Sequence, residues 1–125
     1  MKYNEILLMI IVIMLFSAAG CGNGQRGSLA VRGGKILTYQ CENGEKILAR
    51  YYSLADGSLN FIKLMMPDGK EYTLPQALSA SGARYTNEIE LVWWIKGNSA
   101  VVESRGENGT WILRNRNCNL ISDTE

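Results

Sequence analysis

The chain has 125 residues, of which 46% are hydrophobic and 20% charged, and 13 Lys and Arg against 12 Asp and Glu leave a net charge of +1. This length suits one domain, the apolar share excludes a disordered chain, and the balanced charge argues against a nucleic-acid-binding protein. The sequence contains no histidine, which removes histidine triads, histidine metal sites and the usual general base at neutral pH. Composition therefore disfavours catalysis, and we expect neither a metal nor a cofactor.

Residues 1–20 have the features of an export signal. The unbroken apolar run at 6–16 is shorter than the roughly 20 residues of a membrane-spanning helix and matches the core of a signal peptide. The small residues Ser-Ala-Ala-Gly at 17–20 then precede Cys21. They resemble the lipobox of bacterial lipoproteins, with Ala18 in place of the usual Leu, and this resemblance implies lipidation of Cys21. A plain secretory signal is the alternative.

Residues 21–34 predict a flexible, lipid-anchored tether. The segment is rich in glycine, with Asn, Gln and Ser and no apolar periodicity. Two or more acyl chains on Cys21 would anchor the protein stably without a transmembrane helix. Because residue 22 is Gly and not Asp, resemblance to Gram-negative lipoproteins implies sorting to the outer membrane, with the domain facing the periplasm.

The cysteines are consistent with export. If Cys21 carries lipid, Cys41 and Cys118 remain as one pair, and an oxidising compartment makes a disulfide between them the default. On the chain-entropy model, a bond closing a loop of this length stabilises the fold by about 4.5 kcal/mol. A domain of roughly 90 residues is marginal without such a bond.

Residues 35–125 predict a domain built from β-hairpins. Dipeptides that tolerate positive φ recur in this region, at 43–44, 56–57, 68–69, 97–98 and 108–109. Between them lie segments rich in β-branched and aromatic residues, in which we expect strands at 35–41, 45–53, 58–66, 70–74, 89–96, 99–104 and 110–115. Seven or eight short antiparallel strands on one core suggest a barrel or a sandwich, and we favour a small closed barrel because closure removes exposed edges.

Alternation within these segments predicts which side chains face the core. In 45–53, one face carries Ile47, Ala49 and Tyr51. In 89–96, one face carries Ile89, Leu91, Trp93 and Ile95, so the neighbouring tryptophans point to opposite sides. We expect one of them in the core and regard the other as a candidate contact residue. The stretch 75–86 lacks such alternation, and we expect a surface loop there, with at most one helical turn; loops are frequent binding sites.

This loop carries a resemblance to a known family. Its Ser81, Gly82 and Tyr85 match the Ser-Gly-x-x-Tyr motif of the membrane-bound inhibitors of C-type lysozyme. The family's second motif, Tyr-x-x-x-Thr/Ser-Lys-Gly, corresponds to residues 91–97. There Lys96 and Gly97 match, whereas Leu91 and Ile95 replace the Tyr and the hydroxyl residue. The positions of Cys41 and Cys118 also fit the family's terminal disulfide.

The resemblance implies an eight-stranded antiparallel barrel that binds and blocks C-type lysozyme, with no enzymatic activity of its own. It also implies that the two motifs face each other and enter the lysozyme cleft, where two carboxylates perform the hydrolysis. Lys96 would supply a positive charge and N–H donors, and Ser81 a small hydroxyl. Gly82 would allow close approach of the backbone, Tyr85 would brace the loop, and Gly97 would permit the turn.

Two other functions are open from the sequence. The same anchor and barrel suit a structural envelope lipoprotein that docks on another envelope protein. A peptidoglycan-acting enzyme is the third candidate, because Glu88 and Glu90 at positions i and i+2 of an expected strand would share one face as an acid–base pair. A solvated strand face is the simpler interpretation of these two carboxylates.

Overall fold

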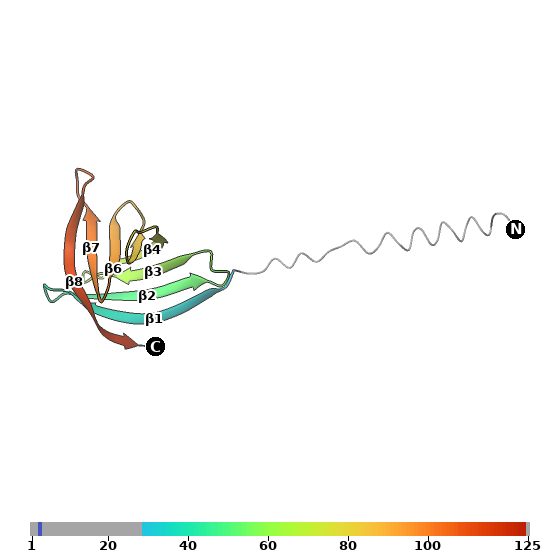
Figure 1. The fold of residues 1–125 in the computed structure, drawn as a ribbon, viewed down its shortest axis with the longest axis horizontal. Helices are drawn as coiled ribbons and strands as arrows, with labels where there is room; N and C mark the ends of the chain where they lie inside the picture. The colour runs from blue at the N-terminus through green and yellow to red at the C-terminus, as the bar shows by residue number, and fades with distance from the viewer. Residues whose placement is uncertain (1–2, 4–28, 125) are drawn as a thin grey trace.

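The computed structural model describes residue 3 and residues 29–124; Cys21 and the apolar run at 6–16 lie outside this part. Its strands form one antiparallel sheet that closes on itself in chain order, with the last strand paired to the first (Figure 1). The strands are β1 (Val31–Gln40), β2 (Lys46–Leu54), β3 (Asn60–Met65), β4 (Glu71–Ala77), β5 (Ala83–Thr86), β6 (Leu91–Lys96), β7 (Ser99–Arg105) and β8 (Trp111–Thr124). The expected all-β, eight-stranded closed barrel is confirmed.

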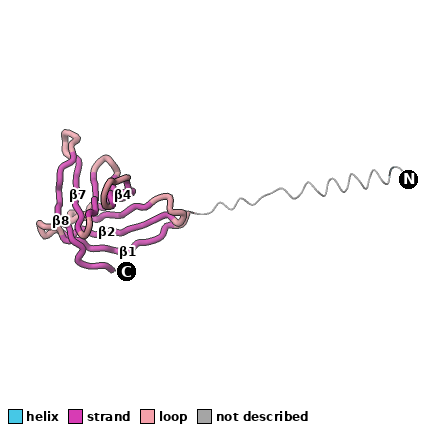
Figure 2. The backbone as a smooth tube through the Cα atoms, in the orientation of Figure 1, coloured by secondary structure: helices cyan, strands magenta, loops and turns pink. Residues whose placement is uncertain are grey.

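Residues 29–124 contain only strands and their connections (Figure 2). All five expected turn dipeptides lie between consecutive strands, and their glycines adopt positive φ, at Gly44, Gly57, Gly69, Gly97 and Gly109. In the part of the chain that the structure describes, no helix has the length and apolar character needed to cross a membrane.

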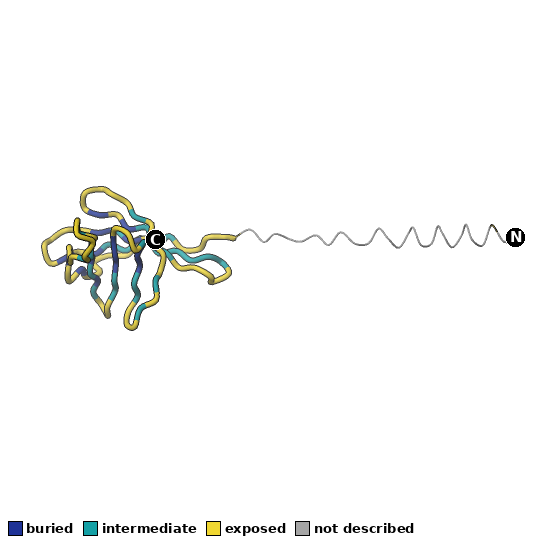
Figure 3. The backbone as a smooth tube through the Cα atoms, turned by 90° about the horizontal axis from the view of Figure 1, so that it is seen from above, coloured by how far each residue is buried: buried dark blue, intermediate teal, exposed yellow. Residues whose placement is uncertain are grey.

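The core lies inside the barrel, and its buried residues are concentrated along the strands (Figure 3). An aromatic cluster joins opposite strands at its centre. The ring of Trp93 on β6 meets Tyr39 on β1 edge-on at 4.9 Å, and its Nε1–H donates to the Tyr51 hydroxyl on β2 at 3.1 Å. Burial raises the pKa of Tyr51 far above its usual range. These contacts join β6 to β1 and β2 across the interior of the barrel.

The prediction that one face of residues 45–53 points into the core is confirmed, since Ile47 and Ala49 are fully buried. Trp93 is likewise buried while Trp94 stays half-buried on the outer face. The placement of Ile89 in that inner face was wrong, because this side chain is 70% exposed and precedes β6. The Asn87 side chain turns the chain there, its Oδ1 accepting the backbone N–H groups of residues 89–91. Because the N–H groups of Ile89 and Glu90 are used in this turn, these two residues do not continue the strand, which begins at Leu91.

The surface loop expected at 75–86 is much shorter in the structure. Strand β4 runs through Pro75 to Ala77, and β5 begins at Ala83, so only residues 78–82 form the loop. No helical turn follows Pro75, which instead pairs with Phe61 of β3. The small and polar residues have weak strand preference by themselves, but pairing with β3 and β6 on either side overrides that preference.

Strand β8 is much longer than the expected segment 110–115. It pairs with β7 from Trp111 to Asn119 and with β1 from Asn119 to Thr124, and both ladders contain register shifts. These irregularities curve the strand so that the barrel can close. Closure thus recruits residues 116–124, which lie beyond the last strand that we expected from the sequence.

The first strand also begins earlier than the expected segment 35–41. Strand β1 begins at Val31, and residues 31–33 of the expected tether pair with residues 52–54 of β2. Gly33 fits there because a side-chain Cβ would lie 2.3 Å from the Tyr51 carbonyl oxygen. Pairing therefore orders glycine-rich residues that composition alone assigns to a linker.

The expected disulfide is confirmed between Cys41, directly after β1, and Cys118 in β8. Both cysteines are buried. The bond joins positions 77 residues apart, at the seam where the first and last strands close the barrel. It therefore restrains the contacts that are most distant in sequence.

Candidate functional site

Strands β5 and β6 place the two candidate motifs side by side. Ala83 pairs with Ile95 in this antiparallel ladder, so the residues just before Ala83 lie opposite the residues just after Ile95. A Cβ added to Gly82 would lie 3.5 Å from the Lys96 Cα. Ser81 and Lys96 are consequently neighbours on one rim of the barrel, as a shared binding site requires.

Gly82 is the point of closest approach between the loop and β6. It has φ +66°, and a Cβ there would lie 2.0 Å from the Ile95 carbonyl oxygen. Only glycine fits this approach without displacing the backbone. The glycine of the first motif therefore sets the distance between the loop and β6, the strand that carries Lys96.

Ser81 presents its hydroxyl to solvent. The residue is exposed, and its side chain makes no hydrogen bond with any described residue. Its backbone carbonyl, by contrast, accepts two hydrogen bonds, from the Ser79 hydroxyl at 2.6 Å and from the Trp94 indole N–H at 2.9 Å. The backbone of the loop is thus held while the side chain of Ser81 is left free for a partner.

Lys96 is exposed at the end of β6 and forms no ion pair within the part of the chain that the structure describes. Its ammonium lies over the Trp94 ring, 3.6 Å from the centroid. Gly97 follows with φ +61° and open space around the Cβ position. The turn residue beside Lys96 is therefore needed for its backbone conformation and not for close packing.

Tyr85 lies in the core, 7% exposed, although its motif begins on the surface. Its ring contacts Tyr51 edge-on at 5.7 Å, and burial raises the pKa of its hydroxyl. It pairs with Trp93 of β6 in the same ladder that brings the motifs together. Tyr85 thus fixes β5 in the barrel two residues after the chain leaves the rim.

The two departures from the second motif face inward. Leu91 is buried and Ile95 is half-buried against the core. The Leu91 carbonyl accepts the Thr86 hydroxyl at 2.8 Å, which closes the β5–β6 connection. Both replacements thus pack behind the rim, and Lys96 keeps an exposed position beside them.

Sequence analysis placed one of the neighbouring tryptophans in the core and made the other a candidate contact residue; Trp94 is the one on the outer face, and it contacts both Ser81 and Lys96. The available signal was the alternation in β6, because residues 94 and 96 share the outer face of one strand. What the alternation does not show is that the loop carrying Ser81 folds back far enough to reach the indole nitrogen.

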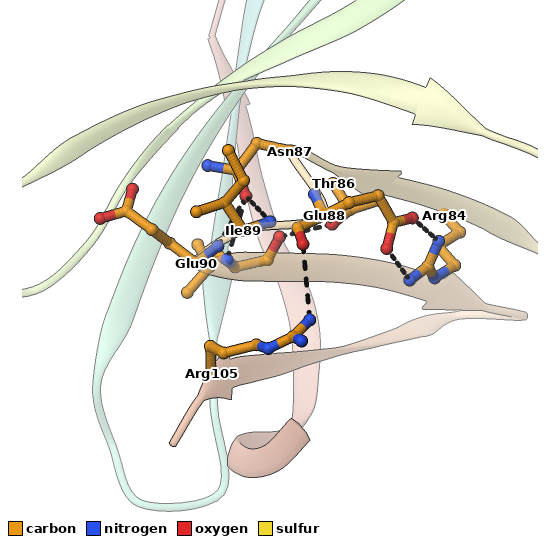
Figure 4. A network of polar contacts seen from close by, with 8 residues as sticks. Arg84, Thr86, Asn87, Glu88, Ile89, Glu90 and Arg105 are labelled. Atoms are coloured by element: carbon orange, nitrogen blue, oxygen red, sulfur yellow. Dashed lines mark hydrogen bonds and ion pairs between the residues drawn. The ribbon is translucent and has the colours of Figure 1, made fainter. Parts of the chain in front are cut away.

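The acid pair proposed for an enzyme is absent from the structure. Glu88 has φ +58° and lies with Glu90 in the turn before β6, where their side chains point apart (Figure 4). The Arg84 guanidinium binds the Glu88 carboxylate at 2.6 Å and holds its pKa below the usual value, while Glu90 pairs with Lys70 at 3.3 Å. A general acid needs a raised pKa, so this arrangement is a surface network and does not support catalysis.

A closed barrel with an exposed hydroxyl and ammonium on one rim is a scaffold for binding. The model of a protein family described as membrane-bound lysozyme-inhibitor of c-type lysozyme matches residues 39–111, which include both motifs. The chain belongs to this family. The proteins of the family are inhibitors and not enzymes, in agreement with the composition and with the surface network around Glu88.

Two curated relatives carry the name membrane-bound lysozyme inhibitor of C-type lysozyme. The protein from Yersinia enterocolitica is 39% identical over 69 residues, which are 55% of this chain and 53% of that protein. The protein from Cupriavidus necator is 30% identical over 83 residues, which are 65% of this chain and 63% of that protein. The matches thus span between half and two thirds of each relative's length. No solved structure matches the sequence.

Proposed function

We propose that this protein is a membrane-anchored inhibitor of C-type lysozyme and that Ser81 and Lys96 enter the lysozyme cleft. Membership of the family and the printed names of two relatives support the target. The observation that carries the proposed site is the pairing of β5 with β6, which sets an unpartnered hydroxyl beside an ammonium without a carboxylate partner among the described residues.

The chemistry of the target explains why these two groups suit it. A C-type lysozyme hydrolyses glycan with two carboxyl groups, one acting as acid and one as nucleophile or stabiliser. Covering that cleft removes water from the carboxylates, so the inhibitor must replace the lost hydrogen bonds. Lys96 brings three N–H donors and a charge, and the Ser81 hydroxyl is small enough to reach between closely spaced acids. Each charge-assisted hydrogen bond contributes about 1.5–3 kcal/mol.

Long-range electrostatic attraction contributes little to the proposed binding of lysozyme. Residues 35–125 contain ten Lys and Arg against eleven Asp and Glu, so the domain is almost neutral. A nearly neutral domain steers a charged partner only weakly. Affinity and specificity then come from the local contacts at the rim, and we expect a small effect of salt on the association rate.

The anchor is the second part of the proposal. Cys21 follows the lipobox-like segment, and the relatives' names include the word membrane-bound. With diacylated Cys21 in the outer membrane, the barrel faces the periplasm at the end of a glycine-rich tether. Labelling cells with a radioactive fatty acid tests this: the protein should carry label, and Cys21→Ser should carry none. Label retained by Cys21→Ser would refute lipidation at this residue.

Inhibition of lysis tests the target. The protein, purified in mild detergent, is added to a C-type lysozyme acting on a cell-wall suspension, with a goose-type lysozyme as the comparison. We expect slower lysis by the C-type enzyme alone. If micromolar protein leaves C-type lysis unchanged, the proposed function is wrong, and crosslinking to an integral envelope protein would then favour the structural lipoprotein instead.

Two matched pairs of variants test the site. Lys96→Ala and Ser81→Ala should each raise the inhibition constant, because truncating one partner of a buried charged pair costs about 2–5 kcal/mol. Lys46→Ala at the start of β2 and Ser122→Ala in β8 remove exposed side chains of the same kinds elsewhere. Equal effects in the site and control variants would place the contact surface elsewhere on the barrel.

A further inference from the structure

We propose that Trp94 is the positioning residue that couples the two motifs, holding the Ser81 loop through its indole N–H and the Lys96 ammonium over its ring. This inference rests on the proposed function, since it assigns to Trp94 a part in lysozyme binding. The two contacts come from different parts of one rigid side chain, the N–H edge and the ring face. Movement of the indole would therefore shift both motifs together.

The setting of Trp94 makes it a suitable support. The residue lies inside the sheet, paired with Arg84 of β5 on one side and Val101 of β7 on the other. Its side chain is half-buried on the outer face. A residue fixed by two neighbouring strands has little freedom to move, so its indole offers a stable surface to a flexible loop and a flexible lysine.

The contact with Lys96 differs from the other cation–ring contacts of the described chain. The Lys96 ammonium is 3.6 Å from the Trp94 centroid, whereas Lys70 is 4.6 Å from Tyr72 and Arg105 is 5.1 Å from Trp111. Lys70 also pairs with a carboxylate, which Lys96 does not within residues 29–124. The ring is thus the group that orders the Lys96 side chain before any partner arrives.

Order before binding has a direct consequence for affinity. A lysine side chain loses much rotational freedom when it is buried at an interface, and ordering it in advance reduces that loss. The ring attracts the ammonium through its face, and N–H groups that point away from the ring stay available for an acceptor. The hydrogen bond to the Ser81 carbonyl likewise fixes the loop while its hydroxyl stays free.

Two substitutions separate the two contacts. Trp94→Phe retains an aromatic face and loses the N–H donor, so we expect about a 2- to 10-fold rise in the inhibition constant. Trp94→Leu loses both contacts and should raise it about 5- to 50-fold. Trp111→Phe and Trp111→Leu are matched controls, because Trp111 also lies under a cation but at the start of β8; they should change the constant less than 2-fold.

A double-mutant cycle distinguishes positioning from a general loss of structure. In the Trp94→Leu background, Lys96→Ala should raise the inhibition constant less than it does in the wild-type protein, whereas Lys46→Ala should have no effect in either background. A separate measurement needs no lysozyme: the ring should shift the NMR signals of the Lys96 methylene protons upfield. Trp94→Phe should keep part of this shift and Trp94→Leu should remove it.

The outcomes separate the failure of this inference from the failure of the proposed function. If the wild-type protein does not inhibit, the function is wrong and the inference falls with it, whatever the NMR shift. If the wild-type protein inhibits but the Trp94 variants match the Trp111 controls, or the cycle shows additive effects, the positioning role alone is overturned. Should Trp94→Leu unfold the barrel, Trp94→Phe and its NMR signals still decide the question.

Discussion

Substitution of Gly82 by alanine tests the close approach that joins the two motifs. The residue has φ +66°, which costs an L-amino acid about 1–2 kcal/mol. The new Cβ would also lie 2.0 Å from the Ile95 carbonyl oxygen, where ordinary contacts begin at 3.4 Å. Relieving this contact requires a backbone shift between β5 and β6, and overpacking of this kind costs about 1–3 kcal/mol. We therefore expect Gly82→Ala to lower the free energy of unfolding by about 2–5 kcal/mol.

Gly97→Ala is the matched control for this measurement. Gly97 has φ +61° and nothing within 4 Å of its Cβ position, so the change carries the conformational cost without the contact. Both substitutions restrict the unfolded chain equally, and this contribution cancels in the comparison. The difference between the two variants, about 1–3 kcal/mol, then reports the close approach alone.

Urea unfolding with the disulfide intact measures the difference. With a slope of about 1–3 kcal/mol per molar urea, the two midpoints should differ by roughly 1 M, with Gly82→Ala the lower. Inhibition of lysozyme should weaken in the same variant, because the backbone shift moves Ser81 relative to Lys96. Equal midpoints for Gly82→Ala and Gly97→Ala would show that β5 and β6 do not approach as described, and the geometry of the site would have to be abandoned.

Three further predictions concern the fold and its titration. Joint substitution of Cys41 and Cys118 by serine should remove about 4.5 kcal/mol of stability; a urea midpoint unchanged from the oxidised wild-type protein would contradict this. Tyr51→Phe leaves the buried indole N–H of the core tryptophan without its acceptor, so unfolding should become easier by about 1–3 kcal/mol in calorimetry, and an unaltered melting temperature would count against the aromatic network. Arg84→Met should raise the pKa of Glu88 toward its ordinary 4.5 in an NMR titration. The Arg84–Glu88 pair lowers the pKa of Glu88 in the folded state, so its stabilisation is present above the pKa of Glu88 in the unfolded chain and is lost as pH falls through the folded-state pKa. The greater stability of the wild-type protein over Arg84→Met should therefore vanish in acid. Identical titration curves of Glu88 in the two proteins would refute the pairing.

Tertiary pairing explains where local patterns failed in this chain. Residues 83–86 were assigned to a loop because the stretch around them is small, polar and irregular, and residues 116–124 were left outside any strand, although Tyr85 and Ile121 are of types that favour strands. Both segments nevertheless pair on two sides, with β4 and β6 in the first case and with β7 and β1 in the second. Conversely, Ile89 fits the apolar alternation but lies in a turn that Asn87 organises. In each case, a partner distant in sequence or a local side-chain hydrogen bond outweighed the intrinsic preference.

The candidate site likewise combines features that the sequence indicates with contacts that only the fold creates. The motif residues Ser81, Gly82, Lys96 and Gly97 were proposed from the sequence because they resemble the motifs of a known family, and the pairing of β5 with β6 brings the two motifs together. The sequence made one of the two neighbouring tryptophans a candidate contact residue but did not show what it touches, since the contact of Trp94 with both motifs depends on how far the loop folds back over β6.

The sequence by itself determined the local chemistry of this protein: positive-φ dipeptides at the turns and alternation in the central strands. These properties depend on residues close together in the chain, so they can be deduced without coordinates. Only the tertiary structure decided how far β8 extends to close the barrel and which ring supports the lysine. Those outcomes depend on pairing between distant segments, whose registers no local pattern specifies.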